Sequence, residues 1–301
     1  MYAPFSYGDV LASSQKAAWQ LDDVLPDDAE LDFTRPFLPE ALARTGGSGL
    51  PDRERLLLNQ IRAHEYLALF GLVEEFILPF VLDHARPLLN GDDLRVRALL
   101  QFAGEEAKHI HLFRRFADTF SRGFGGSCPV IGPAEAIGRA VMAHAPLSVA
   151  LVILHIEWMT QAHYRESVHA DRQIEARFKS LLRHHWMEEA QHARLDTLMV
   201  EALAEGLDAA EIEAGFRGYL DIVDFLDGGL AQQAAMNVAV LECRIGALAP
   251  DTRKRLVEQQ HQASRWTFLG SGMAHPRFRQ TLARLSPEFV ARLDTIAPAY
   301  A

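Results

Sequence analysis

Apolar residues recur along this 301-residue chain with the period of an α-helix. In four long segments, 52–82, 92–122, 133–169 and 171–206, they return every three or four positions, as on one face of a helix. The third segment is interrupted at Pro146, where we expect a bend because proline cannot complete the helical hydrogen-bond ladder. No segment shows the alternation of apolar and polar residues that marks a half-buried strand. The pattern predicts an all-α protein.

The chain divides into two parts of different character. Residues 1–50 hold one short helical pattern, near 12–21, and then an acidic, proline-containing run that ends in the glycine-rich residues 46–49. We expect this part to be an N-terminal arm with a short helix. Residues 51–301 are expected to form an antiparallel bundle with C-terminal packing helices. The additional helical segments are 209–246, 251–268 and two short pieces near Phe278 and Pro287.

Two near-identical hexapeptides suggest the chemistry. Residues 104–109 read Gly-Glu-Glu-Ala-Lys-His, and residues 187–192 read Met-Glu-Glu-Ala-Gln-His. Each contains Glu-x-x-His within a helical segment, and residues three apart lie on one face of a helix. Each motif therefore presents one oxygen and one nitrogen to the same neighbour. The two pairs are Glu106 with His109 and Glu189 with His192.

The helix before each motif carries a glutamate in an apolar run. Glu157 stands in such a run, where a carboxylate needs a partner. In the first helix two adjacent acids compete, and we favour Glu74 over Glu75 because Glu74 shares its face with more of the large apolar side chains; Glu65 is a weaker third candidate. The intervals from Glu74 to Glu106 and from Glu157 to Glu189 are both 32 positions. Equal intervals place the four carboxylates at similar depth.

Three further residues flank the second motif or its counterpart. His185 precedes Glu189 by four positions and His192 by seven, so it lies on the same helical stripe and is a candidate additional ligand. Glu105 and Glu188, next to the motif glutamates, point about 100° away from them. They are expected either to support the ligands or to be solvated.

Together these residues form the ligand set of a two-metal helical bundle. In such bundles two helices each contribute Glu-x-x-His and two others each contribute a glutamate. Carboxylate oxygen and imidazole nitrogen suit iron, and manganese accepts the same ligands. We therefore predict two iron ions, with manganese as the alternative, and no catalytic residue beyond the ligands. The predicted ligands are Glu74, Glu106, His109, Glu157, His185, Glu189 and His192.

The composition excludes several classes of protein. A formal net charge of -10 argues against non-specific binding of nucleic acid, which needs a basic face. The two cysteines, Cys128 and Cys243, support neither a disulfide framework nor a thiolate metal site. Residues 1–10 lack the basic and apolar regions of a signal peptide, and no apolar run is long enough to span a bilayer. A cytoplasmic protein without a membrane partner is expected.

With these residues in view, the chain resembles the p-aminobenzoate N-oxygenase family of ferritin-like di-iron enzymes over roughly residues 55–245. In that family the fourth ligand helix carries His-x-x-x-Glu-x-x-His with an acid before the Glu, as residues 185–192 do here. The second ligand helix carries acid-Glu-x-x-His, matched by residues 105–109, and the lone carboxylates match Glu157 and Glu74. The resemblance implies a ferritin-like four-helix bundle with additional C-terminal helices.

The resemblance also implies an activity. It implies a non-haem di-iron oxygenase that activates O2 through a peroxo-type intermediate and oxidises a small organic substrate, with N-oxygenation of an arylamine as the family's reaction. Electrons would come from an external donor, because no flavin, nicotinamide or iron–sulfur motif is present, and a homodimer is expected for bundles of this type. Two alternatives stay open: an acyl-carrier-protein desaturase-like di-iron oxidase, and a ferritin-like iron-binding or storage protein.

Overall fold

The computed structural model describes residues 5–301 and contains only helices and their connections in that range. Residues 1–4, which belong to the expected arm and to the segment without a signal peptide, lie outside the described range. The prediction of an all-α protein is confirmed. The helices that carry the predicted ligands are α4 (Asp52–Ala85), α5 (Asp93–Phe124), α7 (Pro146–Ala162) and α8 (Ala176–Ala204).

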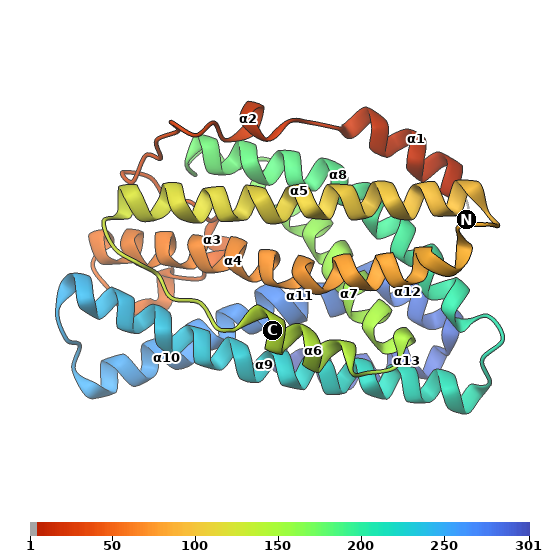
Figure 1. The fold of residues 1–301 in the computed structure, drawn as a ribbon. Coiled ribbons are helices and arrows are strands. Elements are labelled where there is room, and N and C mark those ends of the chain that lie inside the picture. Colours follow the sequence, from red (N-terminus) through yellow and green to blue (C-terminus); the bar gives the residue numbers. More distant parts are fainter. Residues whose placement is uncertain (1–4) are drawn as a thin grey trace.

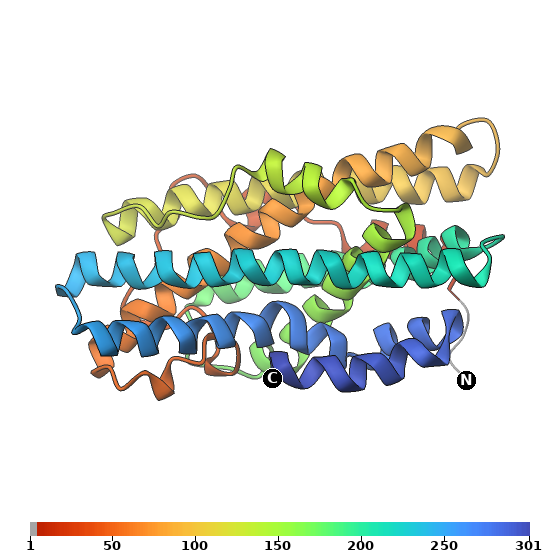
Figure 2. The same cartoon turned by 90° about the horizontal axis from the view of Figure 1, so that it is seen from below.

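These helices form two packed pairs, α4 with α5 and α7 with α8 (Figure 1). Helix α9 (Ala209–Ile245) packs along α7 and α4, and α10 (Pro250–Arg265) returns beside it, as the view in Figure 2 shows. The four-helix bundle is thus followed by helices that cover one of its sides. The remaining C-terminal elements are the π-helical η4 (Trp266–Gly270), α11 (Ser271–Ala274), α12 (Pro276–Leu285), α13 (Pro287–Ile296) and η5 (Ala297–Tyr300).

Local side-chain chemistry sets the ends of the ligand helices. The Asp92 carboxylate accepts a hydrogen bond from the Arg95 amide and starts α5. Gly125, with φ of 71°, ends that helix in the left-handed conformation that glycine adopts without strain. Helix α8 begins five residues later than predicted, because the Glu175 carboxylate caps the Phe178 amide and Asp171 lies in the preceding turn.

The third segment is divided as expected. Helix α6 (Ala134–Met142) ends before Pro146, where α7 begins, and η2 (Arg86–Leu88) joins the first two ligand helices. Beyond Ala162 the chain continues as the π-helical turn η3 (His163–Val168), whose wider spiral is closed by the hydrogen bond from the His169 amide to the Tyr164 carbonyl. Glu157 lies in the C-terminal half of α7, five residues before that helix ends.

The N-terminal segment, residues 5–50, lies against the bundle. Its first helix occupies residues 7–17 rather than 12–21, because the Ser6 hydroxyl caps the Asp9 amide and starts the helix earlier. Figure 1 shows this helix and α2 over α5 and α8. Farther along, the Asn59 side chain accepts hydrogen bonds from the amides of residues 37 and 38. The helical elements of the segment are α1 (Tyr7–Ala17), α2 (Leu21–Val24), α3 (Glu40–Ala43) and η1 (Gly46–Ser48).

None of the helices in the described part of the chain combines the length and the apolar character needed to cross a bilayer.

Candidate metal centre

All seven predicted ligands are buried in the interior of the bundle. Each of the four ligand helices contributes at least one of them, and none has more than 3% of its surface exposed. Burial of so many ionisable groups in one place is costly unless they share charge or an ion. The residues are Glu74 on α4, Glu106 and His109 on α5, Glu157 on α7, and His185, Glu189 and His192 on α8.

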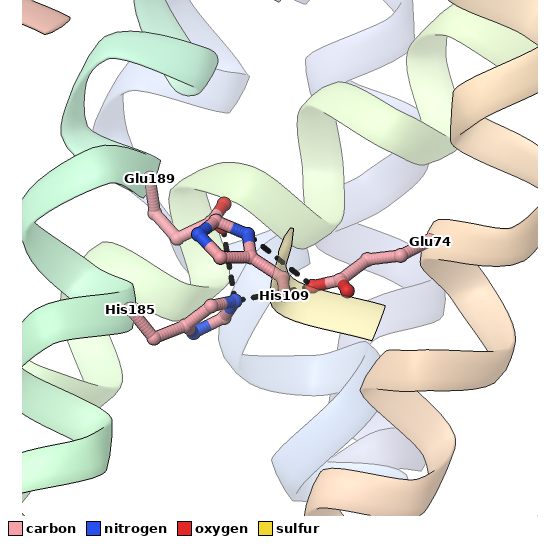
Figure 3. Close-up of side chains that lie close together, drawn as sticks. All are labelled: Glu74, His109, His185 and Glu189. Atoms are coloured by element: carbon pink, nitrogen blue, oxygen red, sulfur yellow. Dashed lines mark hydrogen bonds and ion pairs between the residues drawn. The ribbon is translucent and has the colours of Figure 1, made fainter. Parts of the chain in front are cut away.

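One group of four side chains converges between α4, α5 and α8 (Figure 3). One ligand atom from each of its members lies within 4.8 Å of those of the other three. His185 Nε2 is 3.1 Å from Glu74 Oε1 and 2.9 Å from Glu189 Oε1. His109 Nδ1 is 3.0 Å from the same Glu189 oxygen. These donors surround a point that a metal ion can occupy.

A second group overlaps the first. It comprises Glu106, His109, Glu189 and His192, again with ligand atoms within 4.8 Å of one another. His192 Nδ1 lies 2.8 Å from Glu106 Oε1 and 3.4 Å from Glu189 Oε2. Because His109 and Glu189 belong to both groups, the two positions are adjacent, as in a two-metal site. Glu157 belongs to neither group, although its carboxylate lies close enough for the Glu189 charge to act on it.

Several of the converging atoms contact only other members of the cluster, without hydrogen-bond geometry. Buried oxygens and nitrogens without a hydrogen bond are rare in folded proteins, and each calls for an explanation such as an ion. A cluster of them aimed at one region, all of oxygen or imidazole type, fits iron or manganese. Within the described residues, the ligand atoms without hydrogen-bond geometry are Glu74 Oε2, Glu106 Oε1 and Oε2, His109 Nδ1, Glu157 Oε2, Glu189 Oε1 and His192 Nδ1.

The electrostatics of the group follow from burial and from its own charges. Burial and the negative charge of Glu106 raise the pKa of Glu74 to about 8. Burial, together with the charge of Glu189, raises the pKa of Glu157 well above its ordinary value. Burial alone would lower the pKa of His109, but hydrogen bonds to carboxylates raise it to about 10. Without metal, protons hold this cluster of carboxylates together.

Each motif glutamate has a neighbour that supports the histidine of the other motif. Glu105 of α5 lies 2.8 Å from His192 Nε2 of α8, and Glu188 of α8 lies 2.8 Å from His109 Nε2 of α5. Each contact leaves Nδ1 of the imidazole facing the centre. A carboxylate behind a metal-binding histidine fixes its tautomer and orientation. Of the two expectations for these acids, support of the ligands is therefore right and solvation is wrong.

The N-terminal segment covers the outer side of this arrangement. The Ser14 hydroxyl donates to Glu105, and the Trp19 ring stacks on the His109 ring with centroids 5.9 Å apart. Lys108 donates to the Trp19 carbonyl and forms an ion pair with Glu188. Residues of α1 and of the α1–α2 connection thus contact Glu105 and the His109 ring directly, and they reach Glu188 only through Lys108.

The structure separates the three acids considered on α4. Glu74 faces the centre and contacts His185. Glu75 is exposed and pairs with Arg114 at 2.7 Å. Glu65 is buried elsewhere, in an ion pair with Arg62. Of the three glutamates, only Glu74 belongs to a converging group.

Sequence reasoning missed Asp196. Its carboxylate is fully buried, neither oxygen has a hydrogen bond, and burial raises its pKa well above the ordinary value while His192 opposes this. Asp196 follows His192 by four positions and Glu189 by seven, so it extends the stripe that begins at His185. That spacing was the signal that would have found it.

Comparisons with known proteins give a similarity in fold to solved structures. No protein-family model and no curated protein matches the chain. Among solved structures, R2-like ligand-binding oxidase variants are similar in fold. Two with a Mn/Fe cofactor have TM-scores of 0.47 and 0.46 at 14% and 12% identity, covering 89% and 86% of this chain and 92% of theirs. One with an Fe/Fe cofactor has a TM-score of 0.45 at 14% identity, covering 85% and 91%. At these values the likeness concerns the overall helical fold.

Proposed function

We propose that this protein is an oxidoreductase with a two-metal centre, iron in both positions or with manganese in one, that uses O2 to oxidise a small organic substrate. The observation that carries the proposal is the convergence of six buried carboxylate and imidazole side chains, five of which have inward atoms without a hydrogen bond. Such a cluster would destabilise a helical bundle with a purely structural role, because each buried polar group without a partner lowers the stability of the fold.

The side chains have separable roles in this proposal. His109 and Glu189 would serve both metal positions, Glu106 and His192 would complete one of them, and Glu74 and His185 would complete the other. Four glutamates carry as much negative charge as two divalent ions carry positive charge, which compensates both ions inside an apolar core. Glu157, with one free oxygen beside Glu189, is the remaining carboxylate.

Bound metal ions would supply the redox chemistry that reduces O2, and the protein supplies orientation and a dry site. Incorporation of one oxygen atom into a substrate and release of the other as water requires two electrons and two protons. The electrons would come from an external donor. By the resemblance of the sequence motifs, we propose N-oxygenation of an arylamine as the reaction, in a homodimer in the cytoplasm.

The test begins with anaerobic addition of Fe(II), followed by metal analysis and then O2. We expect about two ions per chain, the number that this ligand set holds, and O2 consumption coupled to product from a panel of arylamines. Products from fatty-acyl thioesters would instead indicate a desaturase. A mineral core within a large spherical assembly on size-exclusion chromatography would indicate storage.

One pair of variants tests the ligand set directly. Glu157→Ala should lower the bound metal to one ion or fewer per chain, because it removes a buried carboxylate at the centre. Glu166→Ala, at an exposed residue of the π-helical turn that follows the same helix, should leave metal content unchanged. Retention of two ions by Glu157→Ala would remove Glu157 from the ligand set.

A further inference from the structure

An apolar cavity of about 410 Å³ lies next to the candidate metal centre. It is formed by α4, α7, α9 and η4, with one wall from the connection between α5 and α6 and the first residues of α6. The engineered cavity that holds one benzene is about 150 Å³, so this space is large enough for a one- or two-ring molecule. Its walls include Leu69, Phe70 and Val73 of α4, Ile156 and Met159 of α7, and Leu230 of α9.

The cavity adjoins the ligands through residues that belong to both. Phe70 lines it, and the same ring contacts the His185 ring edge-on with centroids 5.5 Å apart. Val73 and Ile156 line it directly before Glu74 and Glu157 in the chain. A molecule in the cavity would therefore be separated from the carboxylates of the candidate metal centre by the side chains of these lining residues.

The other end of the cavity opens to solvent along α9. Phe225 lines the cavity and is 45% exposed. Gly228 and Gln232, about one helical turn apart on α9, also line the cavity and are exposed. A Cβ atom added to Gly228 would meet no atom within 4 Å. Entry from this side does not require a helix to move.

The lining carries no charge. None of the residues that form the cavity is acidic or basic, and Gln232 at the mouth supplies its one polar side chain. A carboxylate placed inside would lose its hydration and gain no cation or cluster of donors in return, which is strongly unfavourable. The negative net charge of the whole chain adds to this disadvantage.

We propose that this cavity is the substrate site and that it accepts uncharged, mainly apolar molecules and excludes carboxylate-bearing ones such as p-aminobenzoate. The inference rests on the proposed function for its meaning as a substrate site. It narrows that function, because an arylamine substrate would have to lack an anionic group.

A matched pair of ligands tests whether the cavity excludes carboxylate-bearing molecules. p-Toluidine and p-aminobenzoate are both para-substituted anilines and differ by a methyl group in place of a carboxylate. Binding to the full chain, with and without metal, is measured by displacement of the neutral fluorescent probe N-phenyl-1-naphthylamine. We expect p-toluidine to bind at least about tenfold more tightly, the ratio that corresponds to about 1.4 kcal/mol. Equal affinity, or tighter binding of p-aminobenzoate, would overturn the inference.

Variants at the mouth of the cavity test whether the ligands bind there. Gln232→Lys should strengthen p-aminobenzoate binding and Gln232→Glu should weaken it further, with p-toluidine unchanged in both. Gly228→Phe should weaken p-toluidine, whereas Gly104→Phe, at an exposed helical glycine of α5 that also has open space around its Cβ, should not. Insensitivity of p-toluidine to Gly228→Phe, together with no charge effect at Gln232, would place the ligand elsewhere and overturn the proposal.

The binding measurement separates this inference from the proposed function. If p-toluidine binds as expected but the metal-loaded protein never oxidises it or any neutral arylamine, the preference of the cavity for uncharged molecules is supported and the oxygenase assignment fails. If turnover occurs with p-aminobenzoate and not with p-toluidine, the oxygenase assignment stands and the preference of the cavity for uncharged molecules is refuted.

Discussion

Replacement of Glu74 by glutamine should stabilise the metal-free protein while it removes a metal ligand. Burial raises the pKa of this carboxyl group to about 8, against 4.5 for an ordinary glutamate. At pH 7 the folded state therefore keeps the proton that the unfolded chain releases. The cost is set by the interval between 4.5 and 7 and amounts to about 3 kcal/mol at 1.36 kcal/mol per pH unit. Glu74→Gln removes this cost and keeps the shape.

The sign of the pH dependence is part of the test. A group whose pKa is raised on folding destabilises the folded state as pH increases above its unfolded value, so the gain from Glu74→Gln should be below about 1 kcal/mol at pH 5, reach about 3 kcal/mol at pH 7 and level off only above the folded-state pKa of about 8. Urea unfolding of chelator-treated protein at the two pH values measures it.

The adjacent glutamate is a matched control. Glu75 is exposed and pairs with Arg114, and exposed pairs contribute about 0–1 kcal/mol. Glu75→Gln should therefore leave both the urea midpoint and the metal content nearly unchanged, whereas Glu74→Gln should reduce the metal content. A Glu74→Gln protein that is less stable without metal at pH 7, or that still binds two ions per chain, would refute the reasoning.

Three other outcomes are expected. Glu188→Gln should weaken metal binding about 10- to 100-fold, the usual effect of losing a carboxylate behind a ligand histidine, as measured by competition with a chelator; unchanged affinity would show that the Glu188 contact with His109 does not matter. His185→Ala should keep iron but change the visible spectrum after O2 is added, and an identical spectrum would count against ligation by His185. Burial lowers the pKa of His155 to about 4, so metal-free protein should lose up to about 3 kcal/mol as pH falls from 6.5 to 4; His155→Gln should reduce that loss, and an unchanged acid profile would refute it.

The sequence predicted the ligand helices well because their periodicity is strong. The breaks near residue 90, at Pro146 and after Gly206 are all marked by residues that end helices, and the structure has its breaks there. Helix starts were less accurate. At Asp171 and near Ala12 the true start depends on which of several polar side chains caps an amide, and a pattern of apolar residues does not reveal that.

The candidate site shows the same division. Spacing alone placed Glu106 and His109 on one face of their helix, and Glu189 and His192 on one face of theirs. The structure brings the two faces together. The roles of Glu105 and Glu188 depended on a contact between two helices far apart in the chain, so periodicity within one helix left two alternatives. The cavity had no sequence signal, since its walls come from five separate regions and consist of residues that are common in any core.

The cover formed by residues 5–25 has a practical consequence for anyone who shortens this chain. A fragment beginning just before α4 would retain every predicted ligand and yet uncover the Glu105 carboxylate and the His109 ring, because Ser14 and Trp19 would be gone. Water would then compete for Glu105 and Glu188, and iron would leave such a fragment sooner. Low metal occupancy in an N-terminally trimmed preparation would therefore be a property of the missing cover and not of the seven residues beneath it.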